Sequence, residues 1–402
     1  MRVYQVNVVC GCGSTGRIAA DLAQTIQEHG GESRIAYGRG DAPSEVDAVK
    51  VSNKLDLYVH AMLTRLTDKH GLYSRRSTKR LIKDIKEYNP DIIHLHNIHG
   101  YYVNYEMLFK FLRDYHRPIV WTLHDCWTFT GHCAHFDYVG CEKWKTKCYE
   151  CPQKRIYPCS MLKDNSTDNF IRKQKAFHMP ENMTIVTVSE WLKRVAEQGI
   201  LNERIIKKIY NGVDLDIVQP TESDLRAKYQ LENKKIVLGV ASIWDERKGI
   251  YTFFDLAKFL PEEYQIVMIG LSEKQLGEMP ENILGIPKTA SLKELAKWYT
   301  AADVYVNTSV EETMGLTTVE AMACGTPVIV MNTTGSPELV TEKCGKVVEA
   351  GELELLISAI QSMKKDEKTV AECIKRAKDF EKSKQYKEYI HLYEDIMKNM
   401  EK

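Results

Sequence analysis

Short apolar runs rich in β-branched residues alternate along the chain with longer segments in which apolar residues recur every three or four positions. In the first half we expect strands at residues 4–9, 33–37, 91–95, 119–123 and 184–188. Each run is short and is followed by a loop-like segment. This alternation is typical of parallel sheets covered by helices on both faces, so the pattern predicts a doubly wound α/β fold.

The alternation is interrupted by the turn-rich residues 211–214 and resumes with a strand expected at 235–241. Further strands are expected at 265–270, 304–307 and 327–330, with helices at 292–300 and 317–324. A chain of 402 residues exceeds the usual size of one domain, about 100–200 residues. We therefore expect an N-terminal domain at 1–214 and a C-terminal domain at 215–380.

The last segment, residues 381–402, is charged but carries apolar residues at spacings of three and four, which are Tyr386, Tyr389, Leu392, Tyr393 and Ile396. Such spacing predicts an amphipathic helix. Its apolar face needs a surface of the protein to pack against.

Composition narrows the classes of function. Lys plus Arg equals Asp plus Glu at 55 each, so no global field concentrates a polyanion, and we expect no nucleic-acid partner. No apolar run approaches the roughly 18–20 residues that span a bilayer, and the chain starts with a strand-like run rather than a signal peptide. We expect a cytoplasmic protein.

Gly11, Gly13 and Gly16 follow the first expected strand at the spacing of a dinucleotide-binding fingerprint. The acidic residue that usually ends the second strand is absent, because residues 34–37 are followed by Gly38. Three interpretations stay open: a dehydrogenase site, a tight turn without a ligand, and a helix start whose backbone N–H groups, with Gly16, face the diphosphate of a donor.

Residues 312–327 carry the most informative motif and read E-T-M-G-L-T-T-V-E-A-M-A-C-G-T-P. Glu312 and Glu320 are separated by seven residues, with a glycine and a helix start between them. The segment resembles the E-x7-E signature of family-4 glycosyltransferases, including the trailing E-A-M-A-x-G-x-P. The resemblance implies that Glu312 holds donor-sugar hydroxyls and Glu320 the ribose hydroxyls. It also implies that donor phosphate meets the backbone of Met314, Gly315, Leu316 and Thr317.

Lys248-Gly249 follows the first expected strand of the second domain, where this family carries a basic pair that neutralises the leaving diphosphate. Ser242 stands where the arginine of that pair is expected, and Arg247 is the candidate to replace it. The resemblance further implies the GT-B architecture: two doubly wound Rossmann-like domains facing a central cleft, with the C-terminal helix packing back on the N-terminal domain.

The first domain extends the resemblance. Residues 90–99 read P-D-I-I-H-L-H-N-I-H and residues 121–133 read W-T-L-H-D-C-W-T-F-T-G-H-C. Both are similar to the capsule and exopolysaccharide branch of family 4. His124 resembles the histidine that lines the cleft opposite the donor, which makes it a catalytic candidate together with Lys248 and Glu312. The acceptor-side candidates are His96, Asn97, His99 and Asp125.

A Cys-rich loop is expected at residues 126–159, where Cys133, Cys141, Cys148 and Cys151 form C-x7-C-x6-C-x2-C. Four thiolates can hold a structural zinc ion, and an iron–sulfur cluster uses the same ligands. Free buried thiols or redox pairs are the alternative. No cofactor is expected for catalysis itself.

Eight Lys and Arg residues lie between Met62 and Lys86 among apolar side chains. We favour a solvated helix face, with peripheral contact to an anionic membrane as the alternative. The expected activity is transfer of a hexose from a nucleoside diphosphate sugar to a hydroxyl of a glycan or lipid-linked acceptor, with anomeric retention, in bacterial surface polysaccharide synthesis. The rivals are a nucleotide-sugar epimerase of similar build and a metal-stapled scaffold without activity.

Overall fold

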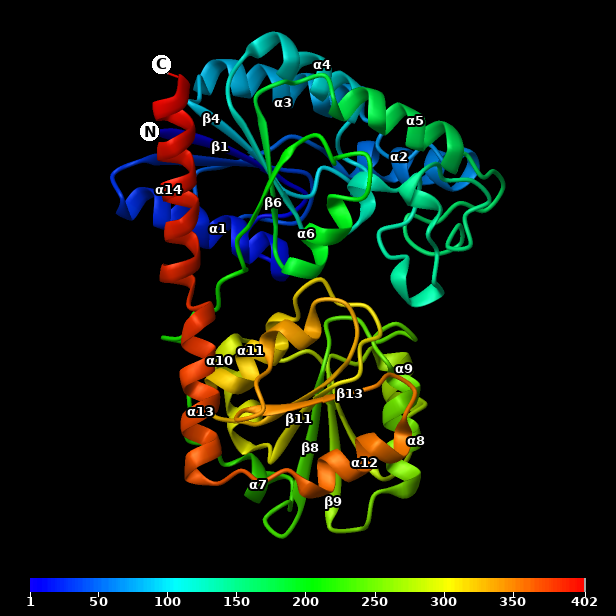
Figure 1. The fold of residues 1–402 in the computed structure, drawn as a ribbon, viewed down its shortest axis with the longest axis vertical. Helices are drawn as coiled ribbons and strands as arrows, with labels where there is room; N and C mark the ends of the chain where they lie inside the picture. Colours follow the sequence, from blue (N-terminus) through cyan, green and yellow to red (C-terminus); the bar gives the residue numbers. More distant parts are fainter. Residues whose placement is uncertain (401–402) are drawn as a thin grey trace. The chain divides into compact units, whose positions relative to one another are not determined.

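The structure, a computed structural model, describes residues 1–400 (Figure 1). Its internal contacts divide the chain into two compact units. The N-terminal unit comprises Met1–Tyr210 and the stretch that begins at Gln385, and the C-terminal unit is Asn211–Lys384. The boundaries expected from the sequence were 214/215 and 380/381.

The N-terminal unit is built on a seven-stranded parallel sheet in the order β3-β2-β1-β4-β5-β6-β7. Its strands are β1 (Arg2–Asn7), β2 (Glu32–Tyr37), β3 (Ala48–Lys50), β4 (Ile92–Leu95), β5 (Ile119–Leu123), β6 (Met183–Thr187) and β7 (Ile205–Lys208). Its α-helices are α1 (Gly13–Glu28), α2 (Lys54–Thr67), α3 (Arg75–Tyr88), α4 (Tyr105–Tyr115), α5 (Ser166–Phe177) and α6 (Glu190–Ala196). The strand order reverses between β1 and β4, which makes this pair the topological switch point.

The segment between β5 and α5 contains only short 3₁₀ turns, which are η1 (Trp127–Phe129), η2 (Asp137–Val139) and η3 (Lys143–Lys145). This segment contains the Cys-rich loop. It is attached to the rest of the unit by side-chain contacts, such as that of His132 with Asp68, and by a backbone hydrogen bond from Met161 to Arg65.

The C-terminal unit has a six-stranded parallel sheet in the order β10-β9-β8-β11-β12-β13. Its strands are β8 (Lys235–Val240), β9 (Tyr264–Ile269), β10 (Ile283–Ile286), β11 (Val304–Asn307), β12 (Val328–Met331) and β13 (Gly345–Val348). Its helices are α7 (Leu225–Lys228), α8 (Ile250–Phe259), α9 (Glu273–Gly277), α10 (Leu292–Ala301), α11 (Leu316–Ala323), η4 (Ser336–Leu339), α12 (Leu353–Ser362), α13 (Glu367–Ala377) and η5 (Lys378–Phe380). Here the switch point lies between β8 and β11.

The last helix, α14 (Lys382–Met400), packs on the sheet of the N-terminal unit. The Tyr393 hydroxyl lies 2.6 Å from His94 Nδ1 in β4, and the Tyr389 hydroxyl lies 2.9 Å from Thr122 Oγ1 in β5. Both tyrosines are buried, as the spacing of apolar residues in this segment predicts. Figure 1 shows this helix as the red end of the chain.

The doubly wound α/β prediction is confirmed, and β5 and β11 match their predicted bounds. Four strands were missed, which are β3, β7, β10 and β13. β3 and β7 form the two edges of the first sheet, and β10 and β13 those of the second. Edge strands are short and partly exposed, so they lack the continuous apolar run that marks a central parallel strand.

Within residues 1–400, no helix combines the length and the apolar character that crossing a bilayer requires.

Candidate donor and acceptor sites

Two loops meet at the switch point of the C-terminal sheet. One follows β8 and carries Arg247 and Lys248, and the other follows β11 and carries Glu312. They are joined by hydrogen bonds from Thr308 Oγ1 to the Lys248 carbonyl (2.8 Å) and from the Val310 N–H to the Arg247 carbonyl (2.9 Å). Because open α/β sheets bind ligands at this point, the fold places the predicted donor residues where a donor is expected.

Lys248 and Glu312 form an ion pair between their Nζ and Oε2 atoms. Both side chains are about four-fifths buried, with exposed fractions of 19% and 18%. The backbone of Glu312 is fixed by Thr334, whose hydroxyl lies 2.8 Å from both its nitrogen and its carbonyl oxygen. The sequence predicted both residues for one site, and the structure brings them into contact.

Arg247 has a structural contact, while its expected part in neutralising the diphosphate stays a prediction. Its Nη1 donates to the carbonyl of Glu311 at 2.9 Å. This contact holds the β11 loop against the β8 loop. Arg247 therefore positions the loop that carries Glu312, whatever charge it adds to the site.

Two glycines permit this geometry. Gly249 has φ +73°, and a Cβ there would lie 2.4 Å from Thr308 Oγ1. Gly315 has φ +88° and precedes α11 at its N-terminus, where a Cβ would lie 3.2 Å from Glu312 Cγ. A side chain at residue 249 would push the two loops apart, and one at residue 315 would be strained by its positive φ and crowd Glu312, so both glycines are required by the site.

Helix α11 carries Thr317 in its first turn and Glu320 one turn further along. Glu320 is 4% exposed, and its Oε2 accepts a hydrogen bond of 2.9 Å from the Tyr299 hydroxyl. Burial, reinforced by the Glu320 carboxylate, raises the pKa of Tyr299 well above its ordinary value, so the hydroxyl stays protonated and donates. Tyr305 donates similarly to Thr317 Oγ1 at 2.8 Å.

Tyr299 and Tyr305 are site residues that sequence reasoning missed. Each lies in an apolar run, one in α10 and one in β11, where a tyrosine is typical of a core position. Only the fold shows that their hydroxyls meet the polar side chains of α11.

The Met314 side chain is buried. Its sulfur accepts a hydrogen bond of 3.2 Å from the Asn211 backbone N–H, and the residue is 1% exposed. The expectation concerned only the backbone of residues 314–317, and it stays a prediction. The side chain itself has a packing role next to residue 211.

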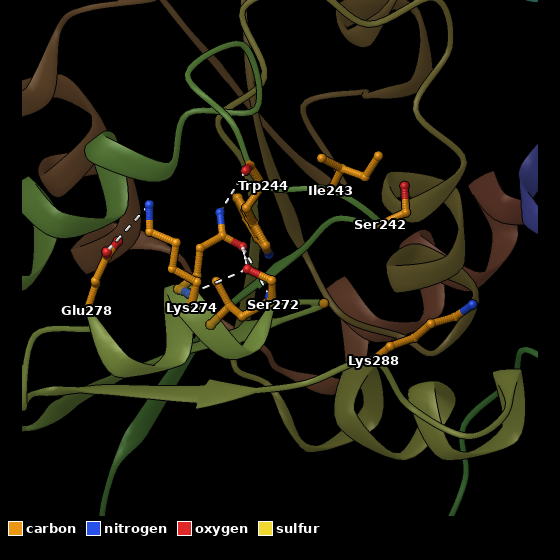
Figure 2. A pocket seen from close by; sticks show the side chains of 10 residues that line it. Ser242, Ile243, Trp244, Ser272, Lys274, Glu278 and Lys288 are labelled. Carbon is orange, nitrogen blue, oxygen red and sulfur yellow. Dashed lines mark hydrogen bonds and ion pairs between the residues drawn. The ribbon is translucent and has the colours of Figure 1, made fainter. Parts of the chain in front are cut away.

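A pocket of about 560 Å³ opens at the carboxyl ends of β8, β9 and β10 (Figure 2). Figure 2 shows Ser242 and Ile243 on one side, Lys288 below them, and Trp244 between these and the Lys274–Glu278 pair. Trp244 is fixed by a 2.9 Å hydrogen bond from its Nε1 to the Ile269 carbonyl. The volume lies within the range of small-molecule sites, about 300–1,000 Å³. Sequence reasoning named Ser242 only as a departure from the family and missed the pocket.

Gly16 lies in the N-terminal unit, within α1. Its carbonyl accepts a 2.9 Å hydrogen bond from the Gly11 N–H, and a Cβ on it would lie 3.0 Å from Val9 Cγ2. A glycine is needed at residue 16 because the tight turn between β1 and α1 leaves little room for a side chain. Its predicted part in donor binding stays a prediction.

The acceptor-side candidates follow β4 and β5, neighbouring strands of the N-terminal sheet. His96 Nδ1 lies 3.1 Å from His124 Nε2, and the two rings are stacked. Burial lowers the pKa of His124 to about 4 and that of His96 well below its ordinary value, so both rings are neutral at pH 7. Asn97 is held through its backbone, whose N–H donates to Asn7 Oδ1 at 3.3 Å.

His99 and Asp125 form the second contact of this group, with Nε2 and Oδ2 2.9 Å apart. Burial alone would raise the pKa of Asp125, but His99 and the Trp127 backbone N–H outweigh it and hold that pKa well below its usual range. The other nitrogen of His99 lies 2.9 Å from the Tyr157 hydroxyl. The structure thus places His124 and the four acceptor-side candidates at the carboxyl ends of β4 and β5. It adds Tyr157, which the sequence did not mark.

The four predicted metal ligands of the Cys-rich loop line one small cavity. The Cys133 thiol hydrogen-bonds Cys151, which lowers the pKa of Cys151 to about 7, and the Gly131 N–H donates to Cys148 Sγ at 3.1 Å. Among residues 1–400, however, no group of three or more His, Cys, Asp or Glu side chains is arranged to hold a metal ion. A structural zinc ion stays a prediction, with free buried thiols or redox pairs, such as Cys133 with Cys151, as its alternative.

Elemental analysis decides between these two. Protein purified without added metal should contain about one zinc per chain, because four thiolates complete a tetrahedral site. Cys148→Ser combined with Cys151→Ser should lose the metal, whereas Cys324→Ser, a buried cysteine of the C-terminal unit, should keep it. Sub-stoichiometric metal together with four titratable thiols in the loop would contradict the zinc prediction.

Comparison with known proteins agrees with this geometry. The chain is 24% identical to the Escherichia coli (strain K12) protein named "Putative colanic acid biosynthesis glycosyl transferase WcaC", over 98% of this chain and all of that protein. Among solved structures, sucrose-phosphate synthase from Thermosynechococcus elongatus superposes with a TM-score of 0.73 at 15% identity, covering 99% of each chain. Anabaena HepE in complex with UDP and glucose gives 0.68 at 16% identity, covering 98% of this chain and all of that one.

The likenesses to solved structures show the GT-B fold, with two α/β domains that each have a parallel sheet. The family model "Glycosyltransferase Family 4" matches residues 15–217, just over half of the chain, and "Glycosyl transferases group 1" matches residues 221–380. The chain belongs to glycosyltransferase family 4.

Proposed function

We propose that this enzyme transfers a hexose from a nucleoside diphosphate sugar to a hydroxyl of a glycan or lipid-linked acceptor, with retention of anomeric configuration. The observation that carries the proposal is the Lys248–Glu312 pair at the switch point, next to the N-terminus of α11. The pair offers a cation for a diphosphate and a carboxylate for sugar hydroxyls. A helix N-terminus adds favourable potential for the same anion.

In this proposal the donor lies along the carboxyl edge of the C-terminal sheet. Its nucleoside occupies the pocket beside Trp244, its ribose hydroxyls donate to Glu320, and its diphosphate faces Lys248 and Thr317. A carboxylate accepts at both oxygens, so Glu312 can hold the Lys248 ammonium and a sugar hydroxyl together. Relatives bind such donors: Anabaena HepE has been solved with UDP-glucose.

The carboxylates support a mechanism without a covalent sugar–enzyme intermediate. Glu312 is paired with Lys248, and Glu320 accepts a hydrogen bond from Tyr299. Each carboxylate therefore suits binding of donor hydroxyls better than nucleophilic attack on the sugar. We propose front-face attack by the acceptor hydroxyl, assisted by the leaving phosphate. Lys248 then offsets the negative charge that grows on the diphosphate as the glycosidic bond breaks.

The acceptor is proposed to contact the histidine group of the N-terminal unit. A neutral His124 ring can accept a hydrogen bond from an acceptor hydroxyl, because burial keeps its pKa near 4. Asp125 is ionised and can accept a second one. The name of the Escherichia coli relative refers to colanic acid biosynthesis, which supports a role in bacterial surface polysaccharide synthesis.

Screening nucleoside diphosphate sugars for thermal stabilisation of the full chain tests the proposal. A donor at about 100 times its dissociation constant adds roughly 2.7 kcal/mol to the free energy of unfolding. Stabilisation by one of these donors, followed by sugar transfer to an added glycan acceptor, is the expected result. Release of a modified free sugar without an acceptor would favour an epimerase instead, and no stabilisation by any donor would contradict the proposal.

A further inference from the structure

Helix α2 of the N-terminal unit is amphipathic, but an apolar side faces solvent and a polar side faces the interior. Its apolar side chains face solvent: Leu55, Tyr58, Val59, Met62 and Leu66 are 70%, 73%, 38%, 45% and 41% exposed. Its fully buried positions are polar, namely His60 and Thr64. Leu55, Tyr58, Met62 and Leu66 are spaced by three or four positions, and Val59 adjoins Tyr58. The five form one stripe along the helix, the α2 apolar face.

Polar contacts hold the inner side of α2 in place. His60 Nδ1 lies 2.7 Å from Ser74 Oγ, and His60 Nε2 accepts from the Gly71 N–H at 3.0 Å. The orientation of the helix is therefore fixed by hydrogen bonds. Much of the α2 apolar face is left to solvent, and such exposure of apolar side chains is unfavourable.

A loop extends the α2 apolar face. The Met161 backbone N–H donates to the Arg65 carbonyl at 2.7 Å, which places residues 161–163 at the C-terminal part of α2. Met161 and Leu162 are 65% and 68% exposed, and Ile156 and Tyr157 earlier in the same loop are 53% and 39% exposed. Exposed apolar side chains gathered on one helix face and on the loop bonded to it indicate an interaction site.

Most charges around this surface are basic, and the exposed Asp164 of the loop accepts hydrogen bonds from the Cys151 N–H and the Ser166 hydroxyl. Exposed Lys54 and Arg65 lie on α2 itself, and Arg155 and Lys163 lie in the loop. Asp56, the one acidic residue of α2, accepts a hydrogen bond from Ser77 at 3.1 Å. Helix α3 follows α2 and adds the exposed Arg75, Arg76, Lys79 and Arg80, while its apolar residues are buried. The earlier interpretation of the basic run as a solvated helix face therefore describes α3 but not α2.

We propose that the α2 apolar face and the loop at 155–163 dock the enzyme on an anionic phospholipid bilayer. Apolar side chains would enter the boundary between headgroups and acyl chains, and the basic side chains would contact lipid phosphates. A second copy of the chain fits this surface poorly. Symmetric pairing through one patch would bring the two basic sets together, and like charges in contact are unfavourable.

The docking surface borders the acceptor-side group. Tyr157 belongs to the exposed loop, and its hydroxyl lies 2.9 Å from His99, which contacts Asp125. This step rests on the proposed function. The position of Tyr157 suits an acceptor carried by a lipid, because the bilayer would present that acceptor beside His99 and Asp125. Bilayer binding itself does not depend on which sugar is transferred, so it is tested separately.

Co-sedimentation of the full chain with vesicles tests the proposal. We expect binding to phosphatidylcholine vesicles that contain about one third phosphatidylglycerol, little binding to phosphatidylcholine alone, and weaker binding at high salt. Tyr58→Ser combined with Met62→Ser, and separately Lys54→Glu combined with Arg65→Glu, should each lower the partition coefficient at least tenfold. Tyr251→Ser combined with Phe259→Ser removes equally exposed apolar side chains from the C-terminal unit, and it should leave binding unchanged.

Three results would overturn the proposal. One is absence of binding to anionic vesicles, and another is equal binding by the α2 variants and the parent. The third is a dimer, measured by analytical ultracentrifugation, that the Tyr58→Ser and Met62→Ser changes dissociate, since the surface would then belong to a second copy. Retained donor stabilisation in the variants would show that the donor site is independent of this surface.

Discussion

Replacing Lys248 by alanine should lower the maximal rate about a hundredfold or more while the fold stays intact. The ammonium lies against Glu312 at the switch point, four-fifths buried, where the leaving diphosphate is proposed to gain charge. An interaction that strengthens in the transition state appears mainly in turnover, and loss of one preorganised charge-stabilising donor costs on the order of 10²–10³ in rate. Steady-state kinetics with the cognate donor, with circular dichroism as the check on folding, measure the effect.

Two further variants separate charge from geometry. Lys248→Arg should recover only part of the rate, because a planar guanidinium cannot place its charge where a compact ammonium lies. Lys258→Ala removes an exposed lysine of α8 that pairs with Asp255, and it should leave turnover unchanged. If Lys248→Ala turns over near the parent rate, the diphosphate contact belongs to another cation.

Replacing Asp68 by asparagine should destabilise the N-terminal unit by about 3–5 kcal/mol, the usual cost of removing one partner of a buried ion pair. Asp68 Oδ1 lies 2.5 Å from His132 Nδ1, and both side chains are fully buried. Oδ2 accepts from the Asn165 N–H at 2.7 Å, and the Asp68 carbonyl accepts from Asn169 Nδ2. One carboxylate thus connects the end of α2, the Cys-rich loop and α5.

Asparagine keeps the size of the side chain and tolerates the left-handed backbone of residue 68, so the variant removes mainly the charge. Hydrogen exchange by mass spectrometry should show faster exchange in α2 and in residues 126–170. Asp47→Asn breaks the more exposed pair with Arg34 and serves as the control, with an expected loss of at most about 1 kcal/mol. Equal exchange in the Asp68 variant and the parent would show that the loop is held by other contacts.

The same pair makes stability depend on pH. Burial alone would lower the pKa of His132, but the hydrogen bond and charge of Asp68 outweigh it and raise that pKa above its ordinary value. Because the pKa of His132 is higher in the folded state than in the unfolded state, its protonation stabilises the fold. This stabilisation is complete below the unfolded-state pKa, about 6.5, and is lost as the pH rises through the folded-state pKa. In Asp68→Asn burial should instead lower the pKa of His132 below its ordinary value, so the dependence should reverse, and stability should fall as the pH drops below about 6.5.

Much of this molecule could be predicted from its sequence because central parallel strands carry continuous apolar runs. Residues 119–123 and 304–307 are examples, and the E-x7-E segment follows the second of them. The proximity of Lys248 and Glu312 could be expected for the same reason, since the two residues follow neighbouring strands whose carboxyl ends lie on the same side of the sheet. The family resemblance supplied the roles of the residues, which periodicity alone does not give.

The remainder depends on contacts that no local pattern reveals. Tyr299 reads as a core residue until the fold brings its hydroxyl to Glu320. The pocket beside Trp244 combines the ends of three strands, including β10, which was missed. The stripe from Leu55 to Leu66 has the spacing of a buried helix face, yet hydrogen bonds of His60 turn it toward solvent. In each case tertiary contacts decide what the local pattern leaves open.

The central claim is that the C-terminal unit binds a nucleoside diphosphate sugar through Glu320 on α11. Titration calorimetry of the full chain with the donor selected by the stabilisation screen tests it most directly. The parent should bind, and Glu320→Ala should bind more weakly by about 1.5–3 kcal/mol, the net worth of hydrogen bonds to a charged group. Glu354→Ala, on the exposed side of α12, is the control and should bind as the parent does. Equal donor affinity in the parent and Glu320→Ala would contradict the account.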